Sequence, residues 1–378
     1  MLYRIGDIYA ERSERGAADM ELLSVTMNDG VIQRSEIEGK DNSSEDKSNY
    51  KVVRKGDMVY NSMRMWQGAN GVSPYDGIVS PAYTVLTAKL PICNEYFAAL
   101  FKNYKLINEF RKNSQGMTSD TWNLKYPQIE TIKVYLPEVA EQEKVASMLV
   151  TLGKRIAAQA TLVEQLKKYK RGVISALLSS KTNPYYSSET WKEVALCDVA
   201  SGFEYGMNAA ATVYDGSHKY IRITDIDDNS HLYSQDVPVS PEGQVDEKYR
   251  VRENDILFAR TGASVGKSYR YQRSDGDLYY AGFLIRIHVN SDVNCGYVFQ
   301  NTLTEAYRRW VLLESARSGQ PGINAEQYKQ YRFLLPPLEL QNKISTLATN
   351  LDNLICKEGN LLSQIEQVKT ALLQRLFI

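Results

Sequence analysis

The chain has 378 residues, 43% of them hydrophobic, and its 45 Lys and Arg residues balance 45 Asp and Glu residues. This length exceeds one ordinary domain and allows two or three, each with a sizeable core. A net charge of zero argues against a nonspecific DNA coat, which is normally basic, and no apolar run approaches the roughly 18–20 residues of a membrane span.

The first segment, residues 1–136, has the mixed pattern of a globular domain. Its first twelve residues carry charges where a secretion signal needs an apolar stretch, which predicts a cytoplasmic protein. Strands are predicted at 51–60 and 78–86, and a helix at 95–112. The charged, serine-rich stretch 39–49 is predicted to be an exposed loop.

Residues 137–180 are predicted to form one long helix. Apolar residues, among them Leu152, Ile156 and Leu166, recur at alternating steps of three and four, interrupted by Gln159 and Lys170. Such a narrow apolar seam calls for a partner helix. Without an internal proline the helix can extend over about 40 residues, or roughly 60 Å at a rise of 1.5 Å per residue. The alternative is an amphipathic helix that packs only on its own globular segment.

A polar linker is predicted at 179–190, and it contains the sequence NPYY at 183–186. This sequence is similar to the Asn-Pro-Pro-Tyr motif of amino-methyltransferases. That motif lies at a strand end and follows a glycine-rich cofactor loop, whereas this copy follows a helix. A polar turn that ends the helix is the favoured interpretation.

The second globular segment, residues 181–335, contains predicted strands at 255–260 and 283–289 and a predicted helix at 297–315. Its stretch GASVGKS at 262–268 resembles a phosphate-binding loop, but only three residues separate the glycines and a strand-like stretch follows. A tight glycine turn between two strands is therefore the favoured interpretation. Such a turn can present Ser264 and Lys267 to a DNA phosphate or base edge.

Basic and amide side chains gather at this turn and at the matching place in the first segment. Between residues 250 and 273 six basic residues accompany two acidic ones, with tyrosines between them. Arg, Lys, Asn and Gln are the side chains that match guanine and adenine edges, although the surface loops of any protein can look similar. The candidate DNA-binding residues are Arg64, Gln67, Asn70, Arg260, Ser264 and Lys267.

Residues 336–378 are predicted to form a second long helix. Its apolar series includes Leu351, Leu354, Leu361 and Ile365, and Glu358 interrupts it. The spacing again averages about 3.5 residues, as in a coiled coil.

The chain also resembles itself. Leu136-Pro137 reappears as Leu335-Pro336, and Gln142 as Gln341, both at an offset of 199 positions. A repeat near 200 residues indicates a domain duplication. We expect an α+β fold with two mixed domains in a pseudo-twofold repeat, separated by two long antiparallel coiled-coil helices.

The sequence contains no evident catalytic constellation. Its three histidines lack metal-ligand spacing, there is no G-x-S-x-G nucleophile elbow, and four scattered cysteines without a C-x-x-C pair suggest free thiols in a reducing compartment. This pattern predicts a binding protein that is not an enzyme and holds no metal or cofactor.

Three stretches together resemble the specificity (S) subunit of type I restriction–modification systems. They are DILFARTGASVGK at 255–267, LPPLELQNKI at 335–344 with its long helix, and LPEVAEQEKVASML at 136–149, which repeats the second. LKKYKRG at 166–172 fits the end of a central spacer helix. The first segment departs from the pattern, because NSMRMWQG at 61–68 replaces the Arg-Thr-Gly turn.

The resemblance implies a non-catalytic DNA-recognition subunit. Residues 1–136 and 181–335 would be target-recognition domains, each reading one half of an asymmetric two-part site. Residues 137–180 and 336–378 would be spacer helices that set the length of the gap between the two half-sites in the DNA. The implied partners are double-stranded DNA and two DNA adenine methyltransferase (M) subunits, which bring S-adenosylmethionine, and two motor–nuclease (R) subunits can join.

Two other functions remain open at this point. One is a coiled-coil scaffold whose two heads bind proteins; it predicts no effect on DNA binding when Arg260 and Lys267 are replaced. The other is an autonomous methyltransferase, which requires S-adenosylmethionine bound to the purified chain.

Overall fold

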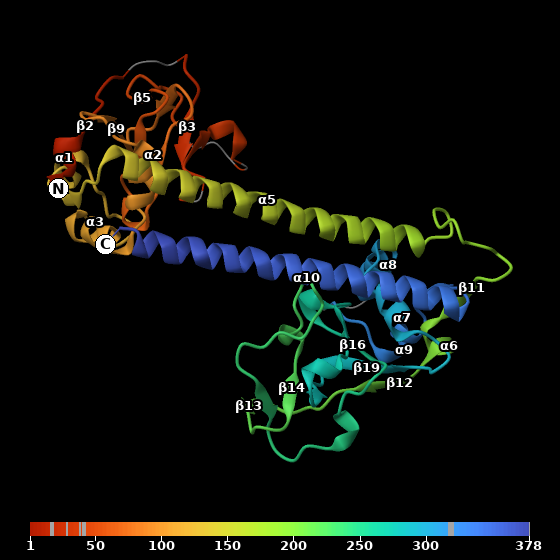
Figure 1. Cartoon of the computed structure of the whole chain (residues 1–378). Helices are drawn as coiled ribbons and strands as arrows, with labels where there is room; N and C mark the ends of the chain where they lie inside the picture. Colours follow the sequence, from red (N-terminus) through yellow and green to blue (C-terminus); the bar gives the residue numbers. More distant parts are fainter. Residues whose placement is uncertain (16–18, 28, 38, 40–42, 317–320, 378) are drawn as a thin grey trace. The chain divides into compact units, whose positions relative to one another are not determined.

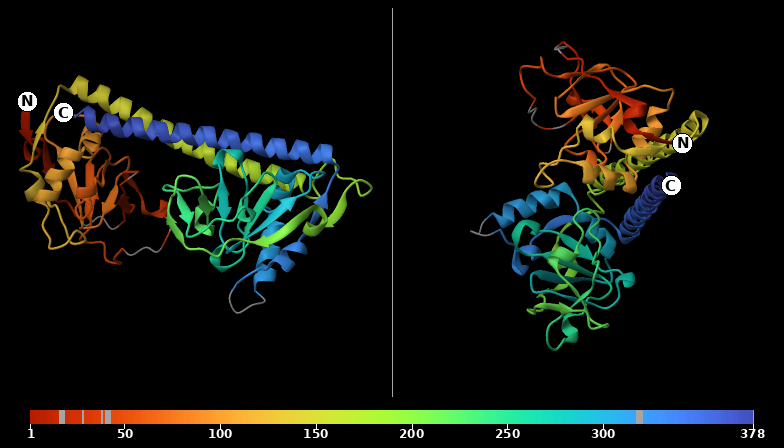
Figure 2. Two further views of the ribbon diagram at one scale, coloured as in Figure 1. Left: turned by 90° about the horizontal axis from the view of Figure 1, so that it is seen from below. Right: turned by 90° about the vertical axis from the view of Figure 1, so that its left-hand side faces the viewer.

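The computed structural model describes residues 1–15, 19–27, 29–37, 39, 43–316 and 321–377. The chain forms two compact units. Unit 1 comprises Met1–Thr161 and Gly359–Ile378, and unit 2 comprises Leu162–Glu358 (Figure 1). Both ends of the chain therefore lie in unit 1 (Figure 2).

A four-stranded antiparallel sheet forms the centre of unit 1. Its order is β2 (Tyr9–Glu11), β9 (Tyr83–Ala88), β6 (Met58–Asn61) and β7 (Asn70–Val72). Three two-stranded ladders accompany it: β1 (Leu2–Arg4) with β10 (Lys133–Tyr135), β3 (Leu23–Val25) with β4 (Val31–Gln33), and β5 (Lys51–Val53) with β8 (Gly77–Val79). The helices are α1 (Ile5–Ile8), α2 (Asn94–Leu100), α3 (Tyr104–Asn113) and α4 (Tyr126–Ile129).

Unit 2 has a sheet with the same connections. Its order is β12 (Ala200–Tyr205), β19 (Leu284–Val289), β16 (Asp255–Ala259) and β17 (Ser268–Arg270). The accompanying ladders are β11 (Lys192–Ala195) with β20 (Arg332–Leu335), β13 (Ala211–Val213) with β15 (Val239–Pro241), and β14 (Lys219–Ile221) with β18 (Leu278–Tyr280). The helices are α6 (Leu196–Val199), α7 (Cys295–Asn301), α8 (Glu305–Ser315) and α9 (Ala325–Lys329).

The element order shows the duplication that the sequence predicts. In each unit a first strand pairs with the strand before a long helix, and a strand–turn–strand hairpin lies at the edge of the main sheet. Small details repeat as well. A left-handed residue precedes the hairpin in both units, Gly56 with φ 93° and Asn254 with φ 68°. Glycine and asparagine tolerate this conformation better than other residues.

Two long helices complete the chain: α5 (Val139–Leu177), with 39 residues, and α10 (Leu338–Arg375), with 38. In unit 2, Ile174 near the α5 end and Leu178 just after it share a core with Ile344 and Ala348 of the α10 start. Farther along, Lys170 Nζ contacts the Asp352 carboxylate at 2.6 Å. These contacts pair a lower residue number in α5 with a higher residue number in α10. The two helices therefore run antiparallel in this unit.

Unit 1 repeats this pairing with the other halves of the helices. Ala146 and Leu149 near the α5 start share a core with Leu372 and Phe377. Unit 1 is also tied to α10 by polar contacts, because Asn103 Nδ2 donates to Leu373 O at 3.0 Å. The antiparallel pairing predicted from the sequence is therefore present in each unit.

The predicted seam residues differ in burial. Leu152, Ile156 and Leu361 in unit 1 and Leu166 and Leu351 in unit 2 are half-buried, and Ile365 is buried. Leu354, in contrast, is 39% exposed, while its neighbour Ile355 is half-buried. The more buried stripe of α10 thus passes through Ala348, Leu351 and Ile355, one position away from the series predicted around Leu354.

Both long helices, the strand at 255–260 and the strand at 283–289 are confirmed with small changes of bounds. Four other predicted elements are each divided in two: 51–60 into β5 and β6, 78–86 into β8 and β9, 95–112 into α2 and α3, and 297–315 into α7 and α8. The breaks have local causes, since the Asn103 and Thr304 side chains cap the second helix of each pair. Residues 40–42 of the predicted loop 39–49 lie outside the described residues.

The NPYY sequence forms the polar turn that was favoured from the sequence. The Asn183 side chain donates to Leu177 O at the end of α5 and accepts from Tyr185 N at 2.7 Å. One amide therefore satisfies a helix-end carbonyl and fixes the turn that follows.

Candidate nucleic-acid interface

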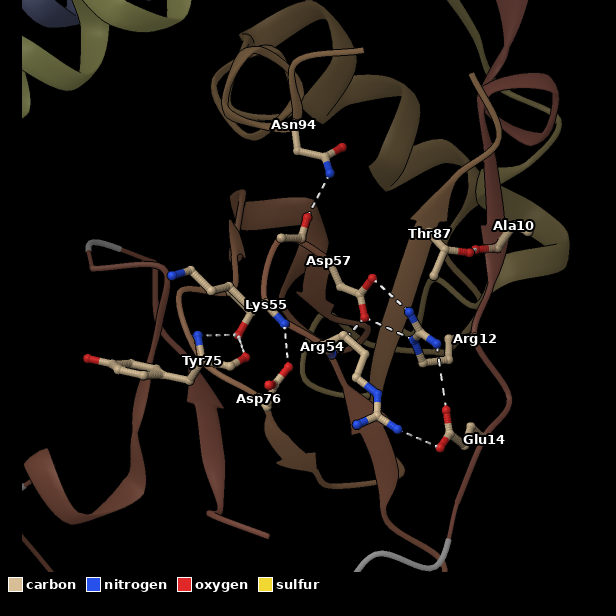
Figure 3. A network of polar contacts seen from close by, with 12 residues as sticks. Ala10, Arg12, Glu14, Arg54, Lys55, Asp57, Tyr75, Asp76, Thr87 and Asn94 are labelled. Atoms are coloured by element: carbon tan, nitrogen blue, oxygen red, sulfur yellow. Dashed lines mark hydrogen bonds and ion pairs between the residues drawn. The ribbon is translucent and has the colours of Figure 1, made fainter. Parts of the chain in front are cut away.

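Each unit anchors the first strand of its hairpin with a buried aspartate. In unit 1, Asp57 accepts from Arg54 N at 2.8 Å and receives two hydrogen bonds from the Arg12 guanidinium, at 2.9 and 3.0 Å (Figure 3). Glu14 contacts both arginines in turn. In unit 2, Asp255 accepts from Arg252 N and His288 Nδ1, each at 2.8 Å, and burial raises its pKa. In each unit, these contacts therefore hold the backbone in place at the start of the first hairpin strand.

The unit 1 turn carries the candidates Arg64, Gln67 and Asn70. A short 3-10 helix, Met65–Gln67, ends at Gly68, whose φ is 84°. Arg64 and Gln67 are exposed. Asn70 is only 1% exposed; its Nδ2 donates to Gly68 O at 3.0 Å, and its Oδ1 accepts no hydrogen bond from the described residues. In this conformation Asn70 shapes the turn from inside, and only the other two reach the surface.

Beside this turn lies an aromatic–arginine cluster that the sequence analysis missed. The rings of Trp66 and Trp122 meet edge to face, with centroids 5.2 Å apart. The Arg111 guanidinium lies 5.9 Å from the Trp66 ring and 5.8 Å from the Trp122 ring. We call these three residues the tryptophan cluster. They come from the turn, from α3 and from the loop after it, and no local pattern links such distant positions.

The unit 2 turn, residues 260–267, is a glycine turn between two strands, as the sequence predicts, but it is longer than a tight turn and contains the short 3-10 helix Gly262–Ser264. Gly262 and Gly266 have φ of 76° and 84°, and an antiparallel strand, β17, follows. A helix, which a phosphate-binding loop requires, does not follow. The half-buried Arg260 stacks its guanidinium 4.6 Å from the ring centroid of Tyr205, a side chain that is 42% exposed. This cation–π contact holds Arg260 at the surface.

Ser264 and Lys267 line one recess of about 330 Å³ together with residues of the segment 223–234. The Lys267 ammonium donates to Ile226 O at 2.8 Å and forms an ion pair with Asp228. The Lys267 side chain is 11% exposed, while that of Asp228 is 81% exposed. The turn therefore presents a lysine–aspartate pair, in which the acidic partner was not identified from the sequence.

The six candidates thus divide into two groups of three, one at each turn. Five of them reach the surface or a surface recess, and Asn70 does not.

Among the described residues, no set of three or more His, Cys, Asp and Glu side chains is placed to hold a metal ion. Within the same residues, no helix combines the length and apolarity that crossing a membrane requires.

Comparison with known proteins gives one consistent family. The model of the type I restriction modification DNA specificity domain matches residues 4–168 and again 188–367. The StySPI specificity subunit of Salmonella potsdam is 23% identical over 303 residues, which cover 76% of this chain and 65% of that protein. The match thus spans less than two thirds of that relative's length. The MjaVIII specificity subunit of Methanocaldococcus jannaschii is 21% identical over 86% of this chain and 79% of its own length.

Solved structures show the same fold. The type I restriction–modification S subunit from M. genitalium superimposes with a TM-score of 0.61 at 14% identity, covering 100% of this chain and 96% of that one. The HsdS subunit from Thermoanaerobacter tengcongensis gives 0.51 at 14% identity, with 100% and 96% covered. These matches do not favour the coiled-coil scaffold. Because the family model covers both halves of the duplication, the chain belongs to the family of the type I restriction modification DNA specificity domain.

Proposed function

We propose that this chain is the DNA sequence-recognition subunit of a type I restriction–modification complex. Residues 1–136 and 181–335 act as target-recognition domains, and each reads one half of a bipartite, asymmetric site. The segments 137–180 and 336–378 act as spacer helices that set the gap. The chain performs no chemistry itself: two methyltransferase (M) subunits methylate adenine, and two motor–nuclease (R) subunits can join the complex.

One observation carries this proposal: the same hairpin occurs twice on the same scaffold, but with different side chains at its turn. Identical turns would suit a palindromic site, whereas different turns suit two different half-sites. Arg64 and Gln67 serve one half, and Arg260, Ser264 and Lys267 serve the other. Asn70 supports the first turn from below.

The long helices support the gap-setting role. α5 continues without a break from residues of unit 1 into residues of unit 2, and α10 continues without a break from residues of unit 2 into residues of unit 1. A continuous helix rises by a fixed 1.5 Å per residue, so 39 residues extend over roughly 60 Å. That length compares with roughly 34 Å for one turn of B-DNA. The neutral charge of the chain fits a complex in which the methyltransferase subunits share the phosphate contacts.

The first test is a map of methylated adenines, obtained by single-molecule sequencing of DNA from cells that express this chain with its methyltransferase subunit. We expect one motif with two unlike halves and a fixed gap. A palindromic or uninterrupted motif would contradict the proposal. Replacing Arg260 by Ala should weaken binding of one half-site while complex assembly is unchanged.

The second test changes the spacer helices. Inserting about one helical turn into both α5 and α10 at facing positions should lengthen the gap and leave both half-sites as they are. The matched control inserts the same residues into the 184–190 linker, where the gap should not change. A change of half-site identity in the helix variant would refute the gap-setting role.

A further inference from the structure

The lysine–aspartate pair of unit 2 lies where one strand turn meets a second loop. Lys267 ends the 260–267 turn, and Asp228 belongs to the loop between the bridged residues Ile226 and Tyr233. The pair opens onto the recess that Ser264 also lines. Lys267 lies beneath, mostly buried, and Asp228 is presented to solvent.

The loop that carries Asp228 is held rigidly. Asp227 N donates to Leu232 O at 2.9 Å, and the Asp227 carboxylate accepts from Ser230 N at 2.7 Å. His231 Nδ1 contacts Ser268 O at 2.8 Å and fixes the loop to β17. Hydrogen bonds from Ser230 also keep the pKa of Asp227 below its usual range. A recognition group needs such support from its surroundings if it is to discriminate.

A neighbouring ammonium and carboxylate match the edge of one base pair. In the major groove guanine presents the acceptors O6 and N7, and its partner cytosine presents the N4 amino donor. Lysine commonly contacts guanine, and aspartate accepts from cytosine N4. An ammonium has three donors, of which Ile226 O and Asp228 engage two.

We propose that Lys267 and Asp228 read a single G·C pair in the half-site of unit 2, with Lys267 on guanine and Asp228 on cytosine. This inference rests on the proposed function and adds the base that one turn selects. An exposed carboxylate at the turn repels phosphates, so its place there suits an amino group on a base edge rather than the DNA backbone.

A second ion pair in the same unit provides a matched control. Arg273 and Glu253 also form a salt bridge, both side chains are exposed, and they lie at the opposite end of the hairpin, next to the start of β16 and the end of β17. If breaking any surface ion pair of unit 2 changed the methylated motif, breaking this pair would change it too. We expect the motif to stay the same when the Arg273–Glu253 pair is broken.

The experiment maps methylated adenines for the full chain with its methyltransferase subunit, comparing Lys267→Met, Asp228→Asn, Asp228→Glu and Glu253→Gln. Lys267→Met and Asp228→Asn should relax one G·C position in one half-site, with discrimination there reduced roughly tenfold to a hundredfold. Asp228→Glu, which keeps a carboxylate, should retain most of the preference. Glu253→Gln should leave the motif unchanged.

The outcomes separate the two proposals. If the unchanged chain yields no bipartite motif, the proposed function fails. If it yields that motif and both Lys267→Met and Asp228→Asn leave every position intact, the function stands and the inference is overturned. Relaxation at an A·T position would also overturn it. If Lys267→Met abolishes methylation altogether, Asp228→Asn decides, because the Asp228 side chain is 81% exposed and we expect its replacement to leave the fold intact.

Discussion

The turn after β6 and the turn after β16 hold the same place in their units, yet they differ in chemistry. The first lies beside an edge-to-face tryptophan pair with an arginine, and the second carries a lysine–aspartate pair in a polar recess. Beneath them the supports are alike: a buried aspartate at the strand start and a glycine at φ 84° before the second strand. The two units share the buried frame and differ in the exposed side chains, as the proposed reading of two unlike half-sites requires.

The largest expected difference between the two units comes from replacing the glycine that precedes the second hairpin strand in each, Gly68 or Gly266, by alanine. A Cβ on Gly266 would lie 2.6 Å from Val311 side-chain atoms, whereas one on Gly68 would meet the flexible Lys102 side chain at 3.3 Å. Both alanine variants adopt an unfavourable left-handed backbone, but only Gly266→Ala also overpacks the core. We expect the free energy of unfolding of unit 2 to fall by about 3 kcal/mol in Gly266→Ala, and that of unit 1 to fall by about 1 kcal/mol in Gly68→Ala. Hydrogen–deuterium exchange measures each unit separately, and equal losses would contradict this explanation.

A second comparison concerns the repeated glutamines at the start of the long helices. Gln142 accepts from Cys93 N at 3.0 Å and donates to Pro137 O at 2.9 Å. Gln341 makes the equivalent bonds to Asn294 N and Pro336 O, at 2.9 and 2.7 Å. Replacement by leucine leaves a backbone donor and an acceptor without partners, so we expect about 2 kcal/mol of destabilisation in either unit. Exchange protection of α2 and α7 should fall equally, and a loss in only one unit would argue against duplicated roles.

A third comparison uses the tryptophan cluster of unit 1 and measures DNA binding. Trp122→Ala removes the ring that contacts both Trp66 and Arg111 and should loosen the turn that bears Arg64 and Gln67. Binding of the unit 1 half-site should weaken by about 1 kcal/mol, roughly fivefold, with the unit 2 half-site unaffected. Fluorescence anisotropy with DNA altered in one half or the other distinguishes these cases. If the loss persists on DNA that already lacks the unit 1 half-site, the cluster does not act there.

The smallest expected effect is a difference in pH dependence. All three histidines lie in unit 2, and burial lowers the pKa of His231 below its ordinary value of 6.5. The unfolded chain then binds a proton that the folded unit does not. The stability of unit 2 should therefore fall as pH drops through 6.5 towards the lowered pKa, and level off below it. Urea unfolding at several pH values should show this slope, and His231→Gln should reduce it.

The sequence predicted much of this molecule because its strongest signals are periodic. The apolar seams of α5 and α10 and the glycine turn at 262–266 are visible over short windows, and the repeat at an offset of 199 appears when the chain is aligned with itself. The divided helices were also within reach, since Asn103 and Thr304 are favoured capping residues. Burial of Asn70 depends on packing that a local pattern does not contain.

The missed parts of the candidate site share one property. Trp122 and Arg111 meet Trp66 from positions about fifty residues away, and Asp228 meets Lys267 from a separate loop. Each pairing depends on the tertiary fold. From the sequence alone, Lys267 suits a DNA phosphate or a base edge, and the acidic partner that the fold brings to it favours the base edge.

Unit 1 takes its closing helix from the last part of α10, from Gly359 onward, which comes after all of unit 2 in the sequence. Asn103 bonds to Leu373 O, and Phe377 packs on Tyr96 with ring centroids 5.2 Å apart. On the ribosome, unit 1 therefore keeps an uncovered apolar side until the end of α10 emerges, whereas unit 2 needs only the α5 end and the α10 start, which are made earlier. The order of synthesis and the order of completion are reversed, and the early domain is the one that a chaperone has most reason to hold.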